Sequence, residues 1–246
     1  MDRMIYVAMN GAQQTMLAQS IHTHNLANVS TTGFRADLAV FQSLPVSGPG
    51  WASRTYAQPQ ASEVDLTQGQ IMNTGRELDV AINGVGFIAV QAPDGSEAYT
   101  RTGDLQISPN GLLETGAGHP VLGNGGPIAL PPAEKIEIGA DGTISIRPVG
   151  QSATTLAIVD RIRLVNPPPE SLGKSADGLL RDKEGIQAVP DAKIRLISGA
   201  LEGSNVNAVE AMVSIIALAR GFEVQVKLMK AAEETDSASA QLMRLG

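Results

Sequence analysis

Residues 135–146 read KIEIGADGTISI. Isoleucines alternate with other residues on both sides of an Asp-Gly pair, with Ile136 and Ile138 before it and Ile144 and Ile146 after it. Alternation with a period of two predicts a strand with one buried face, and Asp-Gly between two such runs predicts a hairpin. We therefore expect antiparallel β structure in the middle of the chain.

The same pattern of short apolar runs and turn residues continues on both sides of this hairpin, over residues 78–203. Short apolar runs there are separated by turn pairs: Asn83-Gly84, Asp94-Gly95, Asn110-Gly111, Asn124-Gly125 and Asp177-Gly178. Such frequent turns favour short strands joined locally over a βαβ repeat. Residues 78–203 are therefore predicted to form a central, mostly antiparallel β domain.

The region before this domain, residues 36–77, loses clear periodicity. Pro45, Pro49 and Pro59 interrupt it, together with several glycines. This composition predicts an extended connector, with a possible short hairpin between Val64 and Met72.

The N-terminal segment, residues 1–35, has the pattern of a helix. It has no proline, and residues at spacings of four, three and four form a narrow stripe: Ile5, Met9, Ala12 and Met16. That spacing is typical of a coiled-coil seam. The helix is expected to fade near Asn28, before Gly33 offers a residue that tolerates positive φ.

The C-terminal segment, residues 204–246, also has a helical pattern. Asn207 followed by Glu210 resembles a capping box, which marks the start of a helix. A second seam follows at alternating spacings of three and four: Met212, Ile215, Ala219, Phe222, Val226 and Met229. The fold class predicted is α+β, with N- and C-terminal helices on either side of a β domain.

The pattern of the two seams leaves two arrangements open. The helices could pack onto their own β domain, or their seams could pair with other copies or other proteins. An isolated helix pair joined by a long connector would have little core of its own, which favours partners outside the chain.

Composition excludes several classes of function. The net charge of −7 and the absence of a basic run argue against a nucleic-acid partner. The longest apolar run is far short of the roughly 20 residues that a bilayer requires, so no direct membrane insertion is expected. The chain has no cysteine, hence no disulfide, thiolate metal site or cysteine nucleophile. The N-terminus does not resemble a cleaved signal peptide.

Motifs of known chemistry find little support. Gly84, Gly86 and Ala89 match a dinucleotide-binding spacing, but strand-like residues follow them where that motif needs a helix, so a hairpin bend is favoured. His22 and His24 are two positions apart on a helix, so they point to different faces and cannot share a metal as an i, i+4 pair could. We predict no catalytic, cofactor-binding or metal-binding residue, and no enzyme activity.

Several blocks of sequence resemble one family, the bacterial flagellar rod and hook proteins. They are Asn25–Arg35 (NLANVSTTGFR), Leu78–Ile82 with Gly84–Phe87, Tyr99–Gly103 (YTRTG), Leu201–Asn207 (LEGSNVN) and Arg220–Glu223. Within this family, the opening residues 1–9 and the chain length are most similar to the member that builds the proximal rod. The distal rod protein is the alternative, and Gly221, where that protein usually has Ala, slightly favours the proximal member.

The resemblance implies a structural subunit of the flagellar basal body. Its terminal helices would form a coiled-coil layer around the export channel, and the assembled rod would cross the periplasm and transmit torque. Expected partners are other proximal rod subunits, the distal rod protein, copies of itself and the flagellar type III export apparatus, which would export the chain without a cleaved signal. The predicted assembly interface comprises both seams together with Asn25 and Asn28.

Two hypotheses of a different class remain open, a periplasmic carbohydrate-binding β module and an unrecognised hydrolase. A carbohydrate module would be expected to expose aromatic rings for stacking on sugars, and the predicted β domain has only Phe87 and Tyr99. A hydrolase would need a nucleophile or an acid–base pair, and none can be assigned.

Overall fold

The structure is a computed structural model that describes residues 2–45, 55–59, 63–148, 150 and 156–244. Parts of the predicted connector 36–77 and the last two residues of the predicted segment 204–246 lie outside these ranges. The chain divides into two compact units. We call residues 1–27, 37–63 and 207–246 the helical unit, and residues 28–36 and 64–206 the β unit.

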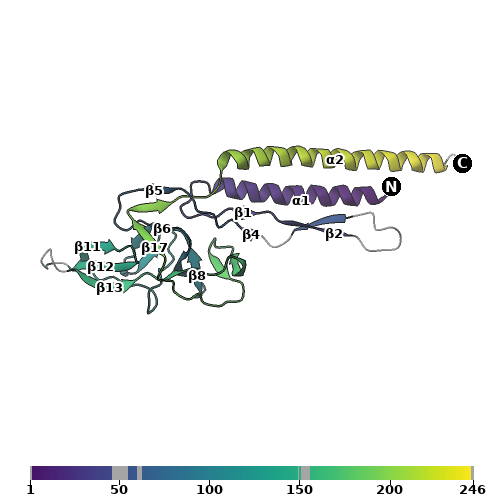
Figure 1. Ribbon diagram of the computed structural model, residues 1–246. Coiled ribbons are helices and arrows are strands. Elements are labelled where there is room, and N and C mark those ends of the chain that lie inside the picture. Colours follow the sequence, from purple (N-terminus) through teal and green to yellow (C-terminus); the bar gives the residue numbers. More distant parts are fainter. Residues whose placement is uncertain (1, 46–54, 60–62, 149, 151–155, 245–246) are drawn as a thin grey trace. The chain divides into compact units, whose positions relative to one another are not determined.

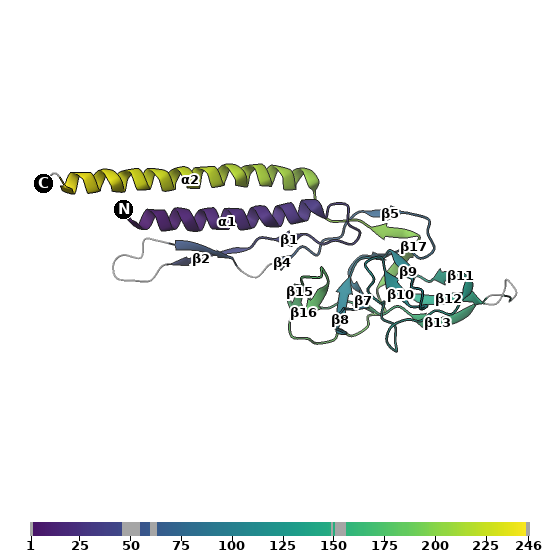
Figure 2. The ribbon, with the colours of Figure 1, turned by 180° about the vertical axis from the view of Figure 1, so that it is seen from behind.

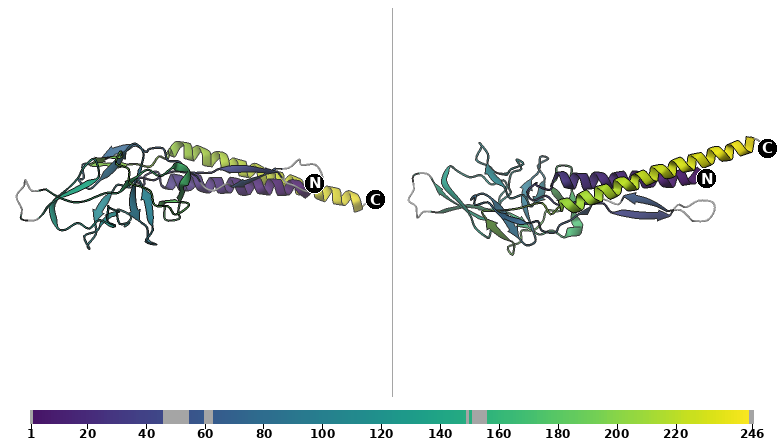
Figure 3. Two further views of the ribbon diagram at one scale, coloured as in Figure 1. Left: turned by 60° about the horizontal axis from the view of Figure 1, so that its bottom comes forward. Right: turned by 90° about the horizontal axis from the view of Figure 1, so that it is seen from above.

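The helical unit contains both helices of the chain's ends, α1 (Asp2–Ala27) and α2 (Ala208–Arg244). They lie side by side and run in opposite directions (Figures 1 and 2), and Figure 3 shows the same pair from two further directions. A Cβ added to Gly11 would lie 3.0 Å from the side-chain amide of Gln225, and one added to Gly221 would lie 3.9 Å from Thr15. In both pairs the residue numbers add up to 236, which fixes the register of the helix pair.

Small residues form the buried side of these helices. Ala8, Ala12 and Ala18 of α1 are no more than 6% exposed, and so are Ala211 and Ala232 of α2. Two helices can approach closely where their facing residues are small. The helices of this chain therefore pack on each other, which is one part of the question that the sequence left open.

The ends of the helices follow from local hydrogen bonds. The Asn207 side-chain oxygen accepts bonds from the backbone N–H groups of Val209 (3.1 Å) and Glu210 (3.3 Å), as expected of an N-cap. Within the predicted segment 1–35, α1 ends at Ala27, which confirms the expected end near Asn28, and the chain then turns before Gly33, whose φ is +67°.

A hairpin packs against α1 within the helical unit. It pairs β2 (Phe41–Pro45) with β3 (Thr55–Pro59), and the backbone N–H of Ala57 donates to the side chain of Asn10 over 3.1 Å. The hairpin predicted between Val64 and Met72 is wrong. β5 (Ile71–Asn73) pairs instead with β18 (Ala200–Glu202), a strand far away in sequence that no local turn signal could indicate.

The β unit consists of short strands, and every pairing described in it is antiparallel. Its largest sheet has five strands in the order β14 (Leu164–Val165), β7 (Phe87–Gln91), β8 (Glu97–Thr100), β16 (Leu180–Asp182) and β15 (Leu172–Lys174). A second sheet has the order β11 (Ala133–Ile138), β12 (Thr143–Pro148) and β13 (Ala157–Arg161). The α+β class with mostly antiparallel sheets is confirmed.

The remaining elements are short. β6 (Val80–Asn83) pairs with β17 (Arg195–Ser198), and β9 (Leu105–Ile107) pairs with β10 (Leu113–Thr115). β1 (Asp37–Leu38) and β4 (Glu63–Val64) flank the β2–β3 hairpin in sequence, and a 3₁₀ turn covers Pro169–Ser171.

The hairpin that opened the sequence argument is present. Ile136 lies opposite Ile146 and Ile138 lies opposite Ile144 in the β11–β12 pair. Of these four side chains only Ile136 is partly exposed, and the others belong to the main apolar core of the β unit. That core also fully buries large residues from other strands, Ile82, Ile88, Val90, Leu105 and Leu113.

The bend at Gly84–Gly86 differs from its prediction. Both glycines have positive φ, +93° and +117°. The strands on either side nevertheless belong to different sheets, since β6 pairs with β17 and β7 pairs with β8 and β14, so the bend is not a hairpin. A strand follows the glycines, so a dinucleotide would find no helix N-terminus here. Neither described helix has the length and apolar content needed to cross a membrane.

Candidate functional site

A buried glutamate joins distant segments of the β unit. Glu202, at the end of β18, has no solvent exposure. One of its carboxylate oxygens accepts hydrogen bonds from Arg35 and from the backbone N–H of Gly69 (2.8 Å), and the other accepts one from Arg101 over 2.9 Å. The side chains of both arginines are 3% exposed. We call Arg35, Arg101 and Glu202 the Glu202 cluster.

The cluster carries two positive charges and one negative charge in a region without water access. Arg101 also donates to the backbone oxygen of Gly84 over 2.7 Å and lies 5.2 Å from the ring centre of Phe87. Burial lowers the pKa of Arg101, and the neighbouring Glu202 carboxylate opposes that shift. An arginine stays charged at physiological pH even so. Loss of the carboxylate would leave two buried cations without a counter-charge, which is strongly destabilising in proteins.

The backbone around the cluster is closely packed. A Cβ on Gly69 would clash with the backbone oxygen of Gly203, and a Cβ on Gly33 would clash with the backbone of Thr102. Gly33 also has positive φ, so both the space and the backbone conformation require glycine there.

Residues 28–36 are held against the β unit at further points. The N–H of Gly33 donates to the backbone oxygen of Glu202 over 2.8 Å, and the Thr102 hydroxyl donates to the Thr32 carbonyl over 3.2 Å. Lys174 donates to the backbone oxygen of Arg35 over 2.9 Å, and its ammonium group lies 3.9 Å from the ring centre of Phe34.

Asn205, three residues after Glu202, holds the same two segments at other points. Its side-chain oxygen accepts a bond from the N–H of Ala36 (2.8 Å), and its NH₂ group donates to the carbonyls of Asp65 (2.9 Å) and Thr67 (3.2 Å). One amide side chain thus replaces the bonds that a neighbouring strand would supply.

A similar arrangement occurs in the helical unit at Asn25. This buried side chain donates to the backbone oxygen of Asp37 over 2.8 Å and accepts from the N–H of Asp37 over 2.9 Å. His24 lies beside it, with its Nδ1 atom 2.9 Å from the Asp37 carboxylate. Asn25, a predicted interface residue, is therefore engaged within its own chain.

The other predicted interface residues divide by exposure. Met9, Met16 and Met212 have about half of their surface exposed, at 51%, 58% and 48%. Ala12 is buried within the helical unit. The rest are half-buried: Ile5, Asn28, Ile215, Ala219, Phe222, Val226 and Met229.

Sequence reasoning missed a group of exposed apolar residues. They are large, exposed side chains on both helices: Met4, Tyr6, Val7 and Leu17 on α1, and Val209, Val213, Ile216, Val224, Leu228 and Met243 on α2. With Met9, Met16 and Met212 they form what we call the apolar helix surface. The spacing of the residues could not distinguish this surface from the buried one, because adjacent faces of each helix carry similar patterns. Residue size would have been the better signal.

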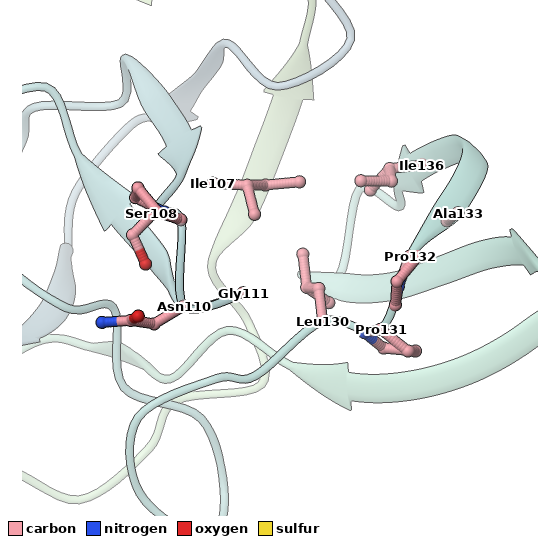
Figure 4. A pocket seen from close by; sticks show the side chains of 10 residues that line it. Ile107, Ser108, Asn110, Gly111, Leu130, Pro131, Pro132, Ala133 and Ile136 are labelled. Carbon is pink, nitrogen blue, oxygen red and sulfur yellow. The ribbon is translucent and has the colours of Figure 1, made fainter.

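A hollow of about 470 Å³ lies elsewhere in the β unit, between the β9–β10 turn and the start of β11. In Figure 4 the side chains of Ile107, Leu130 and Ile136 point toward one another across it. Its other lining residues are small, apolar or polar without charge: Ser108, Pro109, Asn110, Gly111, Pro131, Pro132 and Ala133. None of these groups titrates near neutral pH, so the hollow has no acid–base pair for hydrolysis.

Three family models match the chain. "Flagella basal body rod protein" matches residues 5–35, "Flagellar hook protein FlgE/F/G D1 domain" matches residues 81–146, and "Flagellar basal body rod FlgEFG protein C-terminal" matches residues 197–242. Each matched range contains one member of the Glu202 cluster, namely Arg35, Arg101 and Glu202 in that order.

Similar proteins extend over the whole chain. The flagellar basal-body rod protein FlgF of Salmonella typhimurium is 44% identical, and that of Escherichia coli is 43% identical, each over 100% of both chains. This chain belongs to the FlgF family of flagellar basal-body rod proteins. The flagellar basal-body rod protein FlgG of Buchnera aphidicola (subsp. Schizaphis graminum) is 31% identical over 97% of this chain and 98% of its own. The resemblance to rod and hook proteins is thereby confirmed, and the FlgF family is favoured over FlgG.

The family blocks contain the cluster, but the single sequence could not assemble it. Arg35 and Glu202 are 167 positions apart, and Arg101 and Glu202 are 101 positions apart. Each residue lies in a block quoted for the resemblance, which is the only signal that singled out these segments.

Proposed function

We propose that this chain is a structural subunit of the proximal rod of the bacterial flagellar basal body, without catalytic activity. The observation that carries the proposal is the 44% identity to a rod protein over the full length of both chains. The distal rod position is less supported, since the FlgG relative is 31% identical.

The carbohydrate-binding alternative loses its support in the β unit. Phe87 is 4% exposed and Tyr99 is 1% exposed. The Tyr99 hydroxyl accepts a hydrogen bond from the backbone N–H of Ala188 over 2.8 Å, so its polar end is also used inside the unit. Rings buried in this way cannot stack on a sugar.

The apolar helix surface supports assembly. A soluble monomer rarely exposes a contiguous apolar patch of large size, and such patches are typical of protein interfaces. The alanines of α1 and α2 are already buried within the helical unit, so the larger, exposed residues remain for neighbouring subunits. We propose that these faces, with the half-buried seam residues Phe222, Val226 and Met229, contact other helices in a coiled-coil layer around the export channel.

The remaining roles follow from rod membership. The partners would be other proximal rod subunits, the distal rod protein, copies of itself and, during export, the flagellar type III apparatus. The subunit would reach the periplasm-spanning rod without a cleaved signal peptide and transmit torque there. Nucleic-acid binding and direct membrane insertion play no part in this proposal.

The test replaces one residue of the apolar helix surface. Ile216, 54% exposed on α2, is changed to Lys, which is a good helix former. We expect the free energy of unfolding of the monomer to change by less than about 0.5 kcal/mol, because the residue is exposed. Rods should nevertheless fail to assemble, because a charge then faces an apolar neighbour.

The matched control is Ile158→Lys in β13, where the side chain is 74% exposed. This variant should assemble and support swimming. Monomer stability, secretion, basal-body composition and motility are measured for both. Normal basal bodies in the Ile216→Lys strain would show that this face of α2 is not an interface.

A further inference from the structure

The chain passes between the helical unit and the β unit four times. The crossings lie between residues 27 and 28, 36 and 37, 63 and 64, and 206 and 207. The β-unit residues next to these crossings are residues 28–36, 64–69 and 202–206. Any force transmitted through the covalent chain between the units must pass through these short segments.

Two side chains gather all of these segments. Glu202 binds Arg35 and the Gly69 N–H through its carboxylate, and its backbone oxygen accepts the Gly33 N–H. Asn205 binds the backbone of Ala36 and of residues 65–67. Both residues themselves lie in the segment that leads into α2.

We infer that Glu202 and Asn205 form a mechanical junction, at which the β unit holds every chain segment that connects it to the helical unit. Glu202 is the positioning residue of this junction, because it holds residues 28–36 through Arg35. The inference rests on the proposed function in one respect: in a rod, torsional load that passes along the chain would enter the β unit here.

The arrangement of the core indicates that the junction can open by itself. The main apolar core of the β unit is built from strands such as β6, β7 and β12, and it includes no residue of 28–36, 64–69 or 202–206. Val64 and Leu66 pack against a second, smaller apolar cluster, so of the connecting segments 28–36 depends most on the polar contacts. Arg101 has further contacts, to the Gly84 carbonyl and to the Phe87 ring, that do not involve Glu202. Arg35 lies on a segment outside the main apolar core. Loss of the Glu202 charge should therefore release residues 28–36 and leave the core folded.

The test measures hydrogen exchange on the full-length monomer carrying Glu202→Gln. We expect exchange at the Gly33 and Gly69 amides to become at least about tenfold faster, because the Gly69 N–H donates to the altered carboxylate and the Gly33 N–H lies on the segment that Arg35 ties to it. The change also leaves Arg101 without its counter-charge, so exchange at Ile88 and Ile144 in the core should rise too, but by a clearly smaller factor than at Gly33. The matched control is Glu137→Gln, whose exposed side chain bonds Lys135 over 2.7 Å and should leave both sets of amides unchanged.

A second variant avoids leaving buried charges. Asn205→Ala removes the acceptor of the Ala36 N–H and the donors to residues 65 and 67. It should speed exchange at Ala36 and leave exchange at Gly33 unchanged. Asn110→Ala, at an exposed turn of the same unit, is its control.

The outcomes separate a junction from a general contribution to the core. Equal acceleration at Gly33 and at Ile88 in Glu202→Gln would show that Glu202 only stabilises the whole β unit. Unchanged exchange at Gly33 would show that other contacts hold residues 28–36. Either result overturns the inference.

A motility measurement tests whether the junction carries mechanical load in the rod. Cells with Glu202→Gln should still assemble basal bodies but lose swimming speed in a viscous medium more than in a thin one. Equal loss in both media would contradict the mechanical role. If deletion of the gene left complete rods, the proposed function would fail, whereas the exchange result on the monomer would stand.

Discussion

The two units of this chain use apolar residues in opposite ways. The β unit buries its largest side chains completely, as Ile88, Leu105 and Leu113 show. The helical unit buries mainly alanines and leaves methionines, valines and isoleucines exposed. Hydrophobic stabilisation grows with the apolar area removed from water, so the β unit gains much more from folding alone. The comparison teaches that the β unit has its own large apolar core, whereas the helical unit leaves apolar area that neighbours would cover in the proposed rod.

The buried polar contacts of the two units also differ, and those of the β unit are the stronger ones. In the β unit a buried carboxylate and two arginines hold distant segments, and loss of one partner is costly. In the helical unit the corresponding contact is neutral, between the Asn25 amide and the backbone of Asp37. A neutral hydrogen bond contributes only about 1 kcal/mol net, so this contact can rearrange more easily on assembly.

The largest effect should come from the core of the β unit. Ile88 is fully buried in β7, and Ile88→Ala should lower the free energy of unfolding of this unit by about 2–5 kcal/mol through lost burial and a cavity. Thermal or urea unfolding with a β-unit probe measures the loss. The helical signal in circular dichroism should remain. Ile158→Ala, at a 74% exposed position, is the control. If Ile88→Ala lost both signals together, the two units would unfold as one, and the contrast between them would fail.

A smaller effect should come from enlarging a buried alanine of the helical unit. Ala12→Leu places three extra carbons at a position that is 6% exposed, and overpacking costs about 1–3 kcal/mol. Helicity of the monomer should fall while unfolding of the β unit stays unchanged. Met9→Leu, at a 51% exposed position of the same helix, should leave helicity intact. Higher helicity in Ala12→Leu would show that the alanine interface has unfilled space, and the contrast between the units would then weaken.

The smallest effect concerns pH. Burial raises the pKa of Asp104 above its ordinary value, and the N–H of Gly116 opposes this. Above the ordinary pKa the unfolded chain loses its proton first, so this residue's contribution to the free energy of unfolding falls as pH rises toward the folded pKa. Asp104→Asn should therefore be more stable than wild type at pH 7 and equal to it well below pH 4. Unfolding curves across this range check the sign, and an Asn variant that is less stable at pH 7 would reverse it.

The sequence predicted those features that depend on neighbours along the chain. Alternating isoleucines around Asp141-Gly142 indicated the β11–β12 hairpin, and Asn207 indicated the start of α2, because both signals act over a few residues. The hairpin at Val64–Met72 was wrong, since the partner of β5 lies about 130 positions further on. The Glu202 cluster could not be predicted for the same reason. On the helices, spacing identified the apolar stripes but could not show that alanines face inward and larger residues outward.

The unequal lengths of the helices have a further consequence. α1 has 26 residues and α2 has 37, and the register in which facing numbers add up to 236 pairs the first residues of α1 with residues near 234. The last ten residues of α2 thus extend beyond α1 by about 15 Å. A single helical segment of that length is marginal in water. Subunits stacked along one axis would overlap over this length. Continuous helix would then bridge the boundary between one subunit and the next.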